Sequence, residues 1–161
     1  MKITTTALMA AIIFVVTYII RIPLPFASGG YLNIGDTPIY IAAYLLGGPA
    51  GAIAGGLGAA MSDLAAGYVF YAVATAVIKG VMGLVCGSLM RTGDMKRFVL
   101  ASVLGGAIMV GGYAIFEAIA FTPYQAIAAV PFNCIQWAGG VIAAAALFPA
   151  VKVVERSLRK R

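Results

Sequence analysis

Three ionisable side chains lie inside long apolar stretches of the chain: Asp63, Lys79 and Glu117. Charged groups are costly in hydrocarbon, and the few that occur there usually mark a functional site. Glu117 is the strongest candidate, because a carboxyl about one helical turn inside a poorly hydrated region must bind a donor group or stay protonated. Asp63 has the alternative of a helix-end residue in the wet interface, and Lys79 that of a snorkelling or structurally paired residue.

Uncharged and loop polar residues at the same predicted depth add further candidates: Asn33, Asp36, Thr75, Asn133 and Gln136. Asn133 and Gln136 are three residues apart and therefore share one face of a helix. Trp137 lies one turn beyond Asn133. A hydrogen bond between two helices explains any single one of these polar residues equally well, and this alternative stays open.

Aromatic residues concentrate in the predicted outer half of the chain's helices: Tyr31, Tyr40, Tyr68, Phe70, Tyr71, Tyr113, Phe116, Phe121, Tyr124, Phe132 and Trp137. The opposite ends have little beyond Phe98 and Phe148. An anchoring belt would place aromatic residues at both membrane interfaces. The excess on one side therefore favours a pocket that stacks a flat ligand, with Tyr68, Tyr71 and Tyr113 among its lining residues. A belt is the alternative.

The composition indicates the class of protein that holds these residues. Of 161 residues, 63% are hydrophobic and 10% charged, whereas a soluble domain carries roughly 25% charged residues. We therefore expect an all-α integral membrane protein with a single domain over residues 1–161. The absence of histidine removes Ser-His and Cys-His catalysis, and Cys86 and Cys134 lie in apolar runs that do not suit a zinc site or a disulfide. We therefore expect no enzyme, cofactor or metal. No phosphate-binding glycine loop is present, so any ATPase must be another chain.

Apolar runs and their breaks predict a compact bundle of six membrane spans, at about 3–20, 37–47, 49–65, 68–90, 98–121 and 131–151. The basic residues Arg91, Lys96 and Arg97 and those within 152–161 belong on the cytoplasmic side, which places both termini in the cytoplasm. The net charge of +6 therefore reflects topology and not nucleic-acid binding. The second span is too short to cross about 30 Å of hydrocarbon, so it must tilt, extend back through the preceding loop or stop short. A signal peptide is an alternative for the first run, whose apolar core is long for that role.

Small residues recur at every fourth position of the third predicted helix, in two adjacent stripes: Gly47, Gly51, Gly55 and Ala59, and Gly48, Ala52, Gly56 and Ala60. Such stripes predict close backbone packing against more than one neighbouring helix. Ala7 and Ala11 differ, because they stand alone on an otherwise bulky first helix. We interpret them as a place where a partner helix docks.

Five distinctive stretches lie in one part of the chain: Tyr31–Asp36, Leu45–Ala52, Ser62–Tyr68, Thr75 and Ile78–Gly80. They resemble the substrate-binding S components of energy-coupling factor (ECF) transporters, most closely those assigned to hydroxymethylpyrimidine, pyridoxine and related heterocycles. The resemblance implies six helices, a vitamin pocket near the outer face capped by the first loop, and a complex with a transmembrane coupling subunit and two ATPases. It also implies a prokaryotic cell membrane, transport by toppling, and Ala7 and Ala11 as the docking motif for the coupling subunit. Glu117, Asn133, Gln136 and Trp137 rest on the local reasoning alone.

The predicted function is that of a binding and translocating subunit for a small aromatic heterocycle of the hydroxymethylpyrimidine or pyridoxine type, or riboflavin. A stand-alone proton-coupled transporter is the alternative, with Asp63, Glu117 and Lys79 as its relay. An intramembrane enzyme and a scaffold subunit without a ligand are two further alternatives, of which the enzyme lacks a paired nucleophile and base. Pro, Gly and Ser in the first loop, residues 21–36, predict an irregular lid over the pocket.

Overall fold

The computed structural model describes residues 2–23, 31–90 and 94–159. Its elements in chain order are α1 (Lys2–Ile19), β1 (Arg21–Pro23), β2 (Tyr31–Asn33), α2 (Asp36–Leu46), α3 (Gly48–Ala65), α4 (Val69–Leu89), α5 (Met95–Ala120) and α6 (Pro123–Arg159). The six helices within these ranges confirm the predicted helical bundle. Much of the predicted lid, residues 24–30, and the basic residues Arg91, Lys160 and Arg161 lie outside the described residues.

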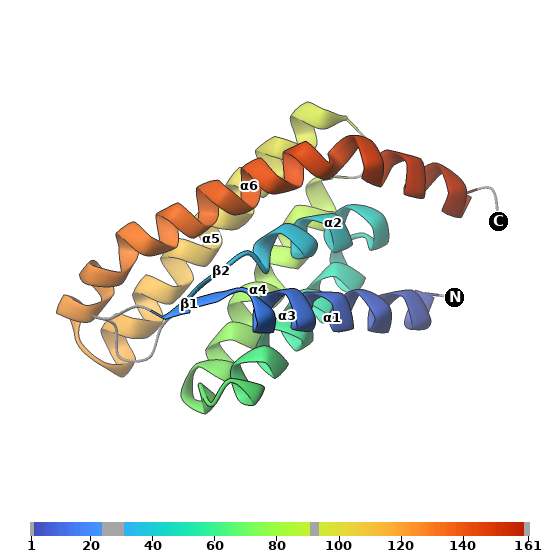
Figure 1. Cartoon of the computed structure of the whole chain (residues 1–161). Helices are drawn as coiled ribbons and strands as arrows, with labels where there is room; N and C mark the ends of the chain where they lie inside the picture. Colours follow the sequence, from blue (N-terminus) through green and yellow to red (C-terminus); the bar gives the residue numbers. More distant parts are fainter. Residues whose placement is uncertain (1, 24–30, 91–93, 160–161) are drawn as a thin grey trace.

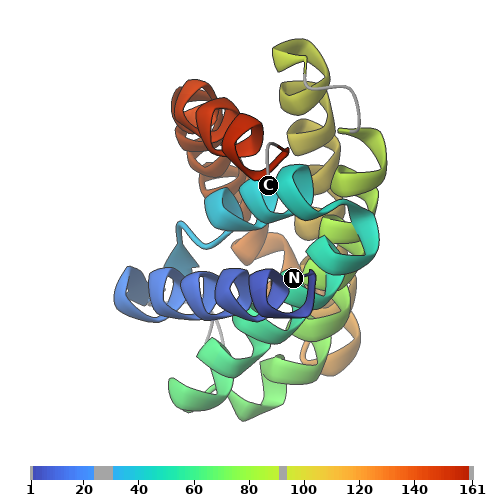
Figure 2. The ribbon, with the colours of Figure 1, turned by 90° about the vertical axis from the view of Figure 1, so that its right-hand side faces the viewer.

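The helices pack largely in chain order. The bundle has α3 against α4, α4 against α5 and α5 against α6, whereas α1 crosses α3. The short α2 lies among α1, α3, α4 and α6 (Figure 1). Both ends of the chain lie at one side of the bundle in Figure 1 and face the viewer in Figure 2. Among the described helices, Val69–Leu89, Met95–Ala120 and Pro123–Ser157 are long and apolar enough to cross a membrane, and Ile3–Ile19 is a shorter apolar helix.

The short second helix stops before it could cross a bilayer. Its 11 residues rise only about 16 Å. It begins at Asp36, so it does not extend back through the preceding loop, and it ends at Gly47, whose φ of 84° is a conformation that glycine adopts freely. Pro49 then occupies the first turn of α3, where a proline costs no hydrogen bond. Protein rather than lipid surrounds much of α2, because most of the segment from Asp36 to Ala43 is buried.

The last helix begins earlier than predicted. We expected its span to start near Pro131, but α6 is helical from Pro123. The Thr122 hydroxyl accepts a hydrogen bond from the Gln125 N–H at 3.2 Å, and Pro123 then takes the first helical position, which suits proline. Pro131 and Pro149 lie inside the helix, as membrane helices tolerate where neighbouring groups satisfy the freed backbone.

The glycine stripes of α3 pack as predicted against several neighbours. A Cβ atom on Gly51 would lie 2.8 Å from the Cα of Ala43 in α2, and one on Gly58 would lie 2.5 Å from the carbonyl oxygen of Ala10 in α1. On Gly56 it would lie 2.7 Å from a carbonyl oxygen of α4. Three helices therefore approach the α3 backbone more closely than any larger residue permits.

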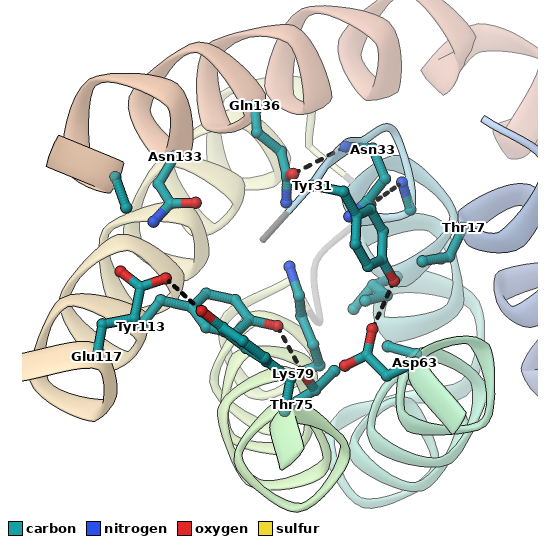
Figure 3. A pocket seen from close by; sticks show the side chains of 15 residues that line it. Thr17, Tyr31, Asn33, Asp63, Thr75, Lys79, Tyr113, Glu117, Asn133 and Gln136 are labelled. Atoms are coloured by element: carbon teal, nitrogen blue, oxygen red, sulfur yellow. Dashed lines mark hydrogen bonds between the residues drawn. The ribbon is translucent and has the colours of Figure 1, made fainter. Parts of the chain in front are cut away.

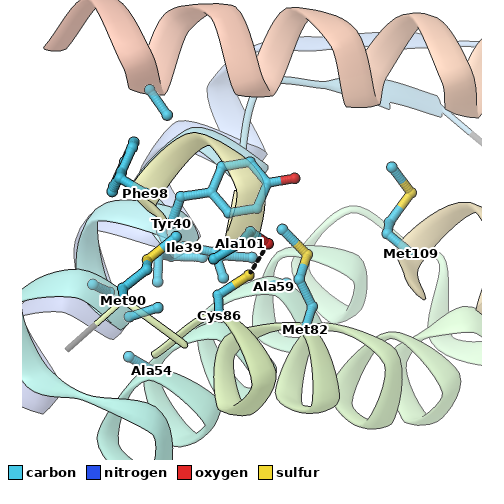
Figure 4. Packing of buried hydrophobic residues seen from close by; sticks show 14 of the residues in the cluster. Ile39, Tyr40, Ala54, Ala59, Met82, Cys86, Met90, Phe98, Ala101 and Met109 are labelled. Atoms are coloured by element: carbon cyan, nitrogen blue, oxygen red, sulfur yellow. Dashed lines mark hydrogen bonds between the residues drawn. The ribbon is translucent and has the colours of Figure 1, made fainter. Parts of the chain in front are cut away.

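The apolar core takes residues from all six described helices, with Ala54 and Ala59 of α3 among those drawn in Figure 4. Tyr40, Met82, Cys86 and Phe98 are fully buried within it. Cys86, which lies in an apolar run of the sequence, is part of this core, and its thiol donates to the Ala101 carbonyl at 3.1 Å. This core leaves the polar residues of the bundle to a separate region next to β2.

The first loop contains two short strands where we expected irregular backbone. β1 pairs with β2 in antiparallel register, with Ile22 opposite Leu32 and Arg21 opposite Asn33. The pairing has a physical reason, because backbone polar groups at the edge of a membrane need partners, and residues such as Ile22 and Tyr31 favour strands. β2 brings Tyr31 and Asn33 beside the helices.

Candidate functional site

A polar cavity lies where β2 meets the helices (Figure 3). Its volume is about 40 Å³, several times the roughly 10–15 Å³ that one water molecule needs. Each of the six described helices contributes to its lining, together with β2. Most of the predicted site residues line it: Asn33, Asp63, Tyr71, Thr75, Lys79, Tyr113, Glu117, Asn133 and Gln136. The structure thus brings together residues that are far apart in the chain.

Lys79 and Asp36 form a buried ion pair at this cavity. The Lys79 Nζ atom contacts Asp36 Oδ1, and the two side chains are 4% and 0% exposed. Gln136 Nε2 donates to Asp36 Oδ2 at 3.1 Å, so both carboxylate oxygens have a partner. Asp36 lies in the first turn of α2, where the helix dipole stabilises a negative charge. Lys79 is therefore neutralised by Asp36, while it still lines the cavity as a donor.

Asp63 and Tyr31 connect β2 to α3. The Tyr31 hydroxyl donates to Asp63 Oδ1 at 2.5 Å, and Asp63 is buried in the cavity wall rather than in the wet interface. Burial raises the pKa of the Tyr31 phenol, and the neighbouring Asp63 charge raises it further, so the phenol stays a donor. On the α4 and α5 side, Thr75 Oγ1 and Tyr113 Oη share a hydrogen bond of 2.9 Å.

Glu117 has one satisfied and one unsatisfied oxygen. The Tyr71 hydroxyl donates to Glu117 Oε1 at 3.2 Å, but Oε2 is buried with no hydrogen-bond partner in the part of the chain that the structure describes. The side chain is 5% exposed, and Asn133 lies on the same side of the cavity (Figure 3). Because an unpaired buried acceptor is costly, this position suits a hydrogen-bond donor from a ligand.

Aromatic rings of α4 and α5 gather beside Glu117. The Tyr71 ring stacks on Phe121 with 5.7 Å between centroids and meets Phe116 edge-on at 5.3 Å. Other outer aromatic residues face away from the protein, since Phe70 is 64% and Tyr124 is 85% exposed. The predicted excess of outer aromatic residues therefore divides between the cavity wall and the exterior of the bundle.

Three predicted site residues do not line the cavity. Asp36 lies behind it, bonded to Lys79 and Gln136. The Tyr68 ring packs on Tyr31 with 5.0 Å between centroids. Trp137 packs against α5 at Gly106, where a Cβ atom would overlap its indole ring. A spacing of one turn from Asn133 placed Trp137 on a neighbouring face of α6, and that face meets α5.

Two polar residues of the cavity wall were not among the predicted site residues. The sequence marked Tyr31 as an outer aromatic residue and as the start of the stretch Tyr31–Asp36, but only Asn33 and Asp36 of that stretch were predicted to be site residues. Thr17 of α1 lines the cavity, is 3% exposed and has an unpaired hydroxyl oxygen among the described residues. The available signal was a lone hydroxyl near the end of an apolar helix, which by itself does not distinguish a site from helix packing.

This fold and this cavity define a helical multi-pass membrane protein with a buried polar cavity. The chain belongs to the family of substrate-binding S components of ECF transporters, since the family model described as "ECF-type riboflavin transporter, S component" matches residues 1–153. It is accordingly a transport subunit for a vitamin or vitamin precursor in a prokaryotic membrane, and not an enzyme.

Two similar proteins extend this comparison. The chain is 32% identical over 152 residues to the "Thiamine precursor transporter HmpT" of Lactococcus lactis subsp. cremoris (strain MG1363), covering 94% of this chain and 87% of that protein. It is 40% identical over 129 residues to the "Uncharacterized protein in gap 3'region" of Pyrococcus woesei, covering 80% of this chain and 86% of that protein. The resemblance found in the sequence is confirmed at the level of the family.

Proposed function

We propose that this S component captures a single-ring nitrogen heterocycle of the hydroxymethylpyrimidine or pyridoxine type in the cavity beside β2. The observation that carries the proposal is the unpartnered Glu117 Oε2 atom, buried in the cavity wall. A carboxylate oxygen accepts hydrogen bonds only, so the ligand should present a donor there. An amino group on an aromatic ring, or a hydroxymethyl group, supplies such a donor.

The distribution of charge supports a donor-rich ligand. The Lys79 charge is matched by Asp36, and Asp63 accepts from Tyr31. Glu117 accepts from the neutral Tyr71 hydroxyl, and its other oxygen has no hydrogen-bond partner among the described residues. An uncompensated carboxylate in a region of low dielectric favours a ligand with hydrogen-bond donors or positive charge. An aminopyrimidine offers both an amino donor and a basic ring nitrogen.

The size of the cavity and the aromatic wall favour a small ring. A volume of about 40 Å³ leaves less room for the three fused rings of riboflavin than for a single ring, and Tyr71 offers a face for stacking. The name of the Lactococcus relative, which assigns it a thiamine precursor, points in the same direction. The family model bears the name of riboflavin, so riboflavin is the competing ligand.

We further propose that transport requires a transmembrane coupling subunit and two ATPases, because the chain has no phosphate-binding motif of its own. Ala7 and Ala11 are exposed on α1. The larger residues Leu8, Ile12 and Val15 beside them are also exposed. Small residues between bulky ones form a notch into which a partner helix fits.

Titration calorimetry on the purified chain tests the ligand assignment. Hydroxymethylpyrimidine, pyridoxine and riboflavin would be compared after the copurifying ligand has been removed and identified by mass spectrometry. We expect one of the two single-ring compounds to bind at least about tenfold more tightly than riboflavin, a difference of about 1.4 kcal/mol. Riboflavin as the tightest ligand, or as the copurified one, would show that the single-ring assignment is wrong.

A further inference from the structure

Gln136 of α6 hydrogen-bonds the chain on both sides of the junction between β2 and α2. Its Oε1 atom accepts a hydrogen bond from the backbone N–H of Asn33 in β2 at 3.0 Å, and its Nε2 atom donates to Asp36 Oδ2 at 3.1 Å. The side chain is 7% exposed. Figure 3 shows it between Asn33 and the Lys79 ammonium group.

The chemistry of its partners fixes the orientation of this amide. A carboxylate only accepts and a backbone N–H only donates, so the carbonyl of Gln136 must face Asn33 and its NH₂ group must face Asp36. The second Asp36 oxygen binds Lys79, which lines the cavity. A continuous chain of polar contacts therefore runs from the cavity through Asp36 and Gln136 to the β2 backbone.

We propose that Gln136 is a positioning residue that latches β2 over the cavity and thereby sets how long a bound ligand stays. The inference rests on the proposed function, because it assumes that the cavity holds the ligand. β2 supplies two wall residues, Tyr31 and Asn33. Tyr31 is held from α3 by Asp63, and Asn33 is held from α6 by Gln136. Loss of the hydrogen bond from Asn33 to Gln136 would therefore release the Asn33 end of β2.

The buried ion pair gives this latch its strength. Gln136 donates to a charged acceptor, and hydrogen bonds to charged groups are stronger than those between neutral groups. The Lys79 ammonium has three donors, so a ligand acceptor can bind it while Asp36 stays in contact. Linked hydrogen bonds polarise one another, and a ligand at Lys79 therefore acts on the same network that holds β2.

Hydrogen exchange in the ligand-free protein tests the latch directly. We expect Gln136→Leu to speed exchange of the Asn33 amide roughly five- to tenfold, the factor that one ordinary hydrogen bond carries. Thr37→Val is the matched control, because the Thr37 hydroxyl bonds the Gly140 carbonyl at 3.3 Å across the same α2–α6 interface without touching β2. The control should leave exchange at Asn33 unchanged.

An exchange of donor and acceptor separates a latch from general packing. Gln136→Glu alone sets two carboxyl groups against each other, and Asp36→Asn alone sets two NH₂ groups against each other unless the glutamine turns away from Asn33. Together they restore the contact, since the introduced amide can donate to the introduced carboxylate. We expect each single variant to speed exchange at Asn33 and the double variant to return it to within about twofold of the parent, as coupled sites do in a double-mutant cycle.

Ligand kinetics test the consequence for binding, with hydroxymethylpyrimidine as the probe. In Gln136→Leu we expect the dissociation rate of hydroxymethylpyrimidine to rise roughly fivefold to tenfold, because one of the hydrogen bonds that hold β2 is lost. The association rate should change less.

Exchange at Asn33 that is the same in parent, single and double variants would overturn the latch. Faster exchange without faster dissociation would overturn its role in residence time. A parent that binds none of the three vitamins would instead overturn the proposed function, and the ligand-free exchange data would still decide whether the latch exists.

Discussion

The α3–α4 seam and the α5–α6 wall associate within the membrane in different ways. In the seam, Cβ atoms on Gly83 and Gly87 would lie 2.5 Å from backbone atoms of α3 and of the α2–α3 junction. In the wall the close contact is with a side chain, since a Cβ atom on Gly106 of α5 would overlap the indole ring of Trp137 in α6. The wall also carries the polar residues Glu117 and Gln136, which line the cavity. The seam is thus closed by backbone against backbone, and the wall by side chains beside the cavity.

The difference shows how the molecule combines a fixed frame with a site. α4 is held by the seam, and the same helix presents Tyr71, Thr75 and Lys79 to the cavity. The positions of these side chains are therefore well fixed, because close backbone packing leaves a helix little freedom to shift. The α5–α6 wall completes the cavity with groups such as Glu117, one of whose oxygens has no hydrogen-bond partner within the described residues. We infer that stability lies chiefly in the seam and ligand recognition chiefly in the wall.

The largest effect is expected at Lys79, which links the two regions. Lys79→Met leaves the Asp36 charge buried without its cation, and breaking a buried ion pair costs about 3–5 kcal/mol. Thermal unfolding in detergent would measure the loss of stability. Combining Lys79→Met with Asp36→Asn removes both charges and should recover most of it. Equal stability of the parent and the single variant would show that the Lys79–Asp36 ion pair does not stabilise the packing of α4 on α2.

The next effect is expected at Glu117 in the wall. Glu117→Gln keeps the shape but removes the charge, and loss of a charged hydrogen bond costs on the order of 2–3 kcal/mol, or roughly 30- to 150-fold in affinity. We expect vitamin binding by calorimetry to weaken by at least about tenfold, with unfolding close to that of the parent. Affinity within about threefold of the parent would remove Glu117 from the site and move the recognition of the ligand toward Asp63 and Lys79.

A smaller effect is expected from one methyl group in the seam. Gly83→Ala places a Cβ atom 2.5 Å from the Gly51 carbonyl oxygen, and overpacking of this kind costs about 1–3 kcal/mol. Gly80→Ala is the matched control on the same helix, because its Cβ atom would lie 3.7 Å from the Ala52 carbonyl oxygen, an ordinary van der Waals contact. We expect a lower unfolding midpoint for Gly83→Ala alone. Equal unfolding midpoints for the two variants would show that the α3–α4 seam accommodates the added methyl group without loss of stability.

The smallest effect on the purified chain is expected on α1. Leucine at both Ala7 and Ala11 should leave folding and vitamin affinity unchanged, because both side chains are exposed. Uptake by cells that also express the coupling subunit and the ATPases should be lost, since the notch for a partner helix is filled. Ala107→Leu, on an exposed position of α5, is the control. Uptake that survives the double substitution would show that docking uses another surface.

Much of the architecture follows from the sequence because it depends on local properties. Hydropathy and the positions of basic residues predicted six helices, and the spacing of Gly51 and Gly55 predicted a closely packed α3. The start of α6 was predicted wrongly at Pro131. The better signal was Thr122 followed by Pro123, a pair typical of a helix start. The strands of the first loop were missed because each has only three residues, too few for a period to be recognised.

The candidate site could likewise be predicted only in part from the sequence. Composition alone determined that the charged groups in apolar helices were the ones to examine, because the cost of a charge in hydrocarbon does not depend on the fold. Only the tertiary structure decided their partners. Lys79 meets Asp36 across 43 positions of sequence, and Gln136 turns toward β2 while Trp137 turns toward α5. One oxygen of Glu117 has no partner in the part of the chain that the structure describes. Pairing depends on how helices are rotated against one another, and that rotation is set by contacts between distant residues which no local pattern encodes.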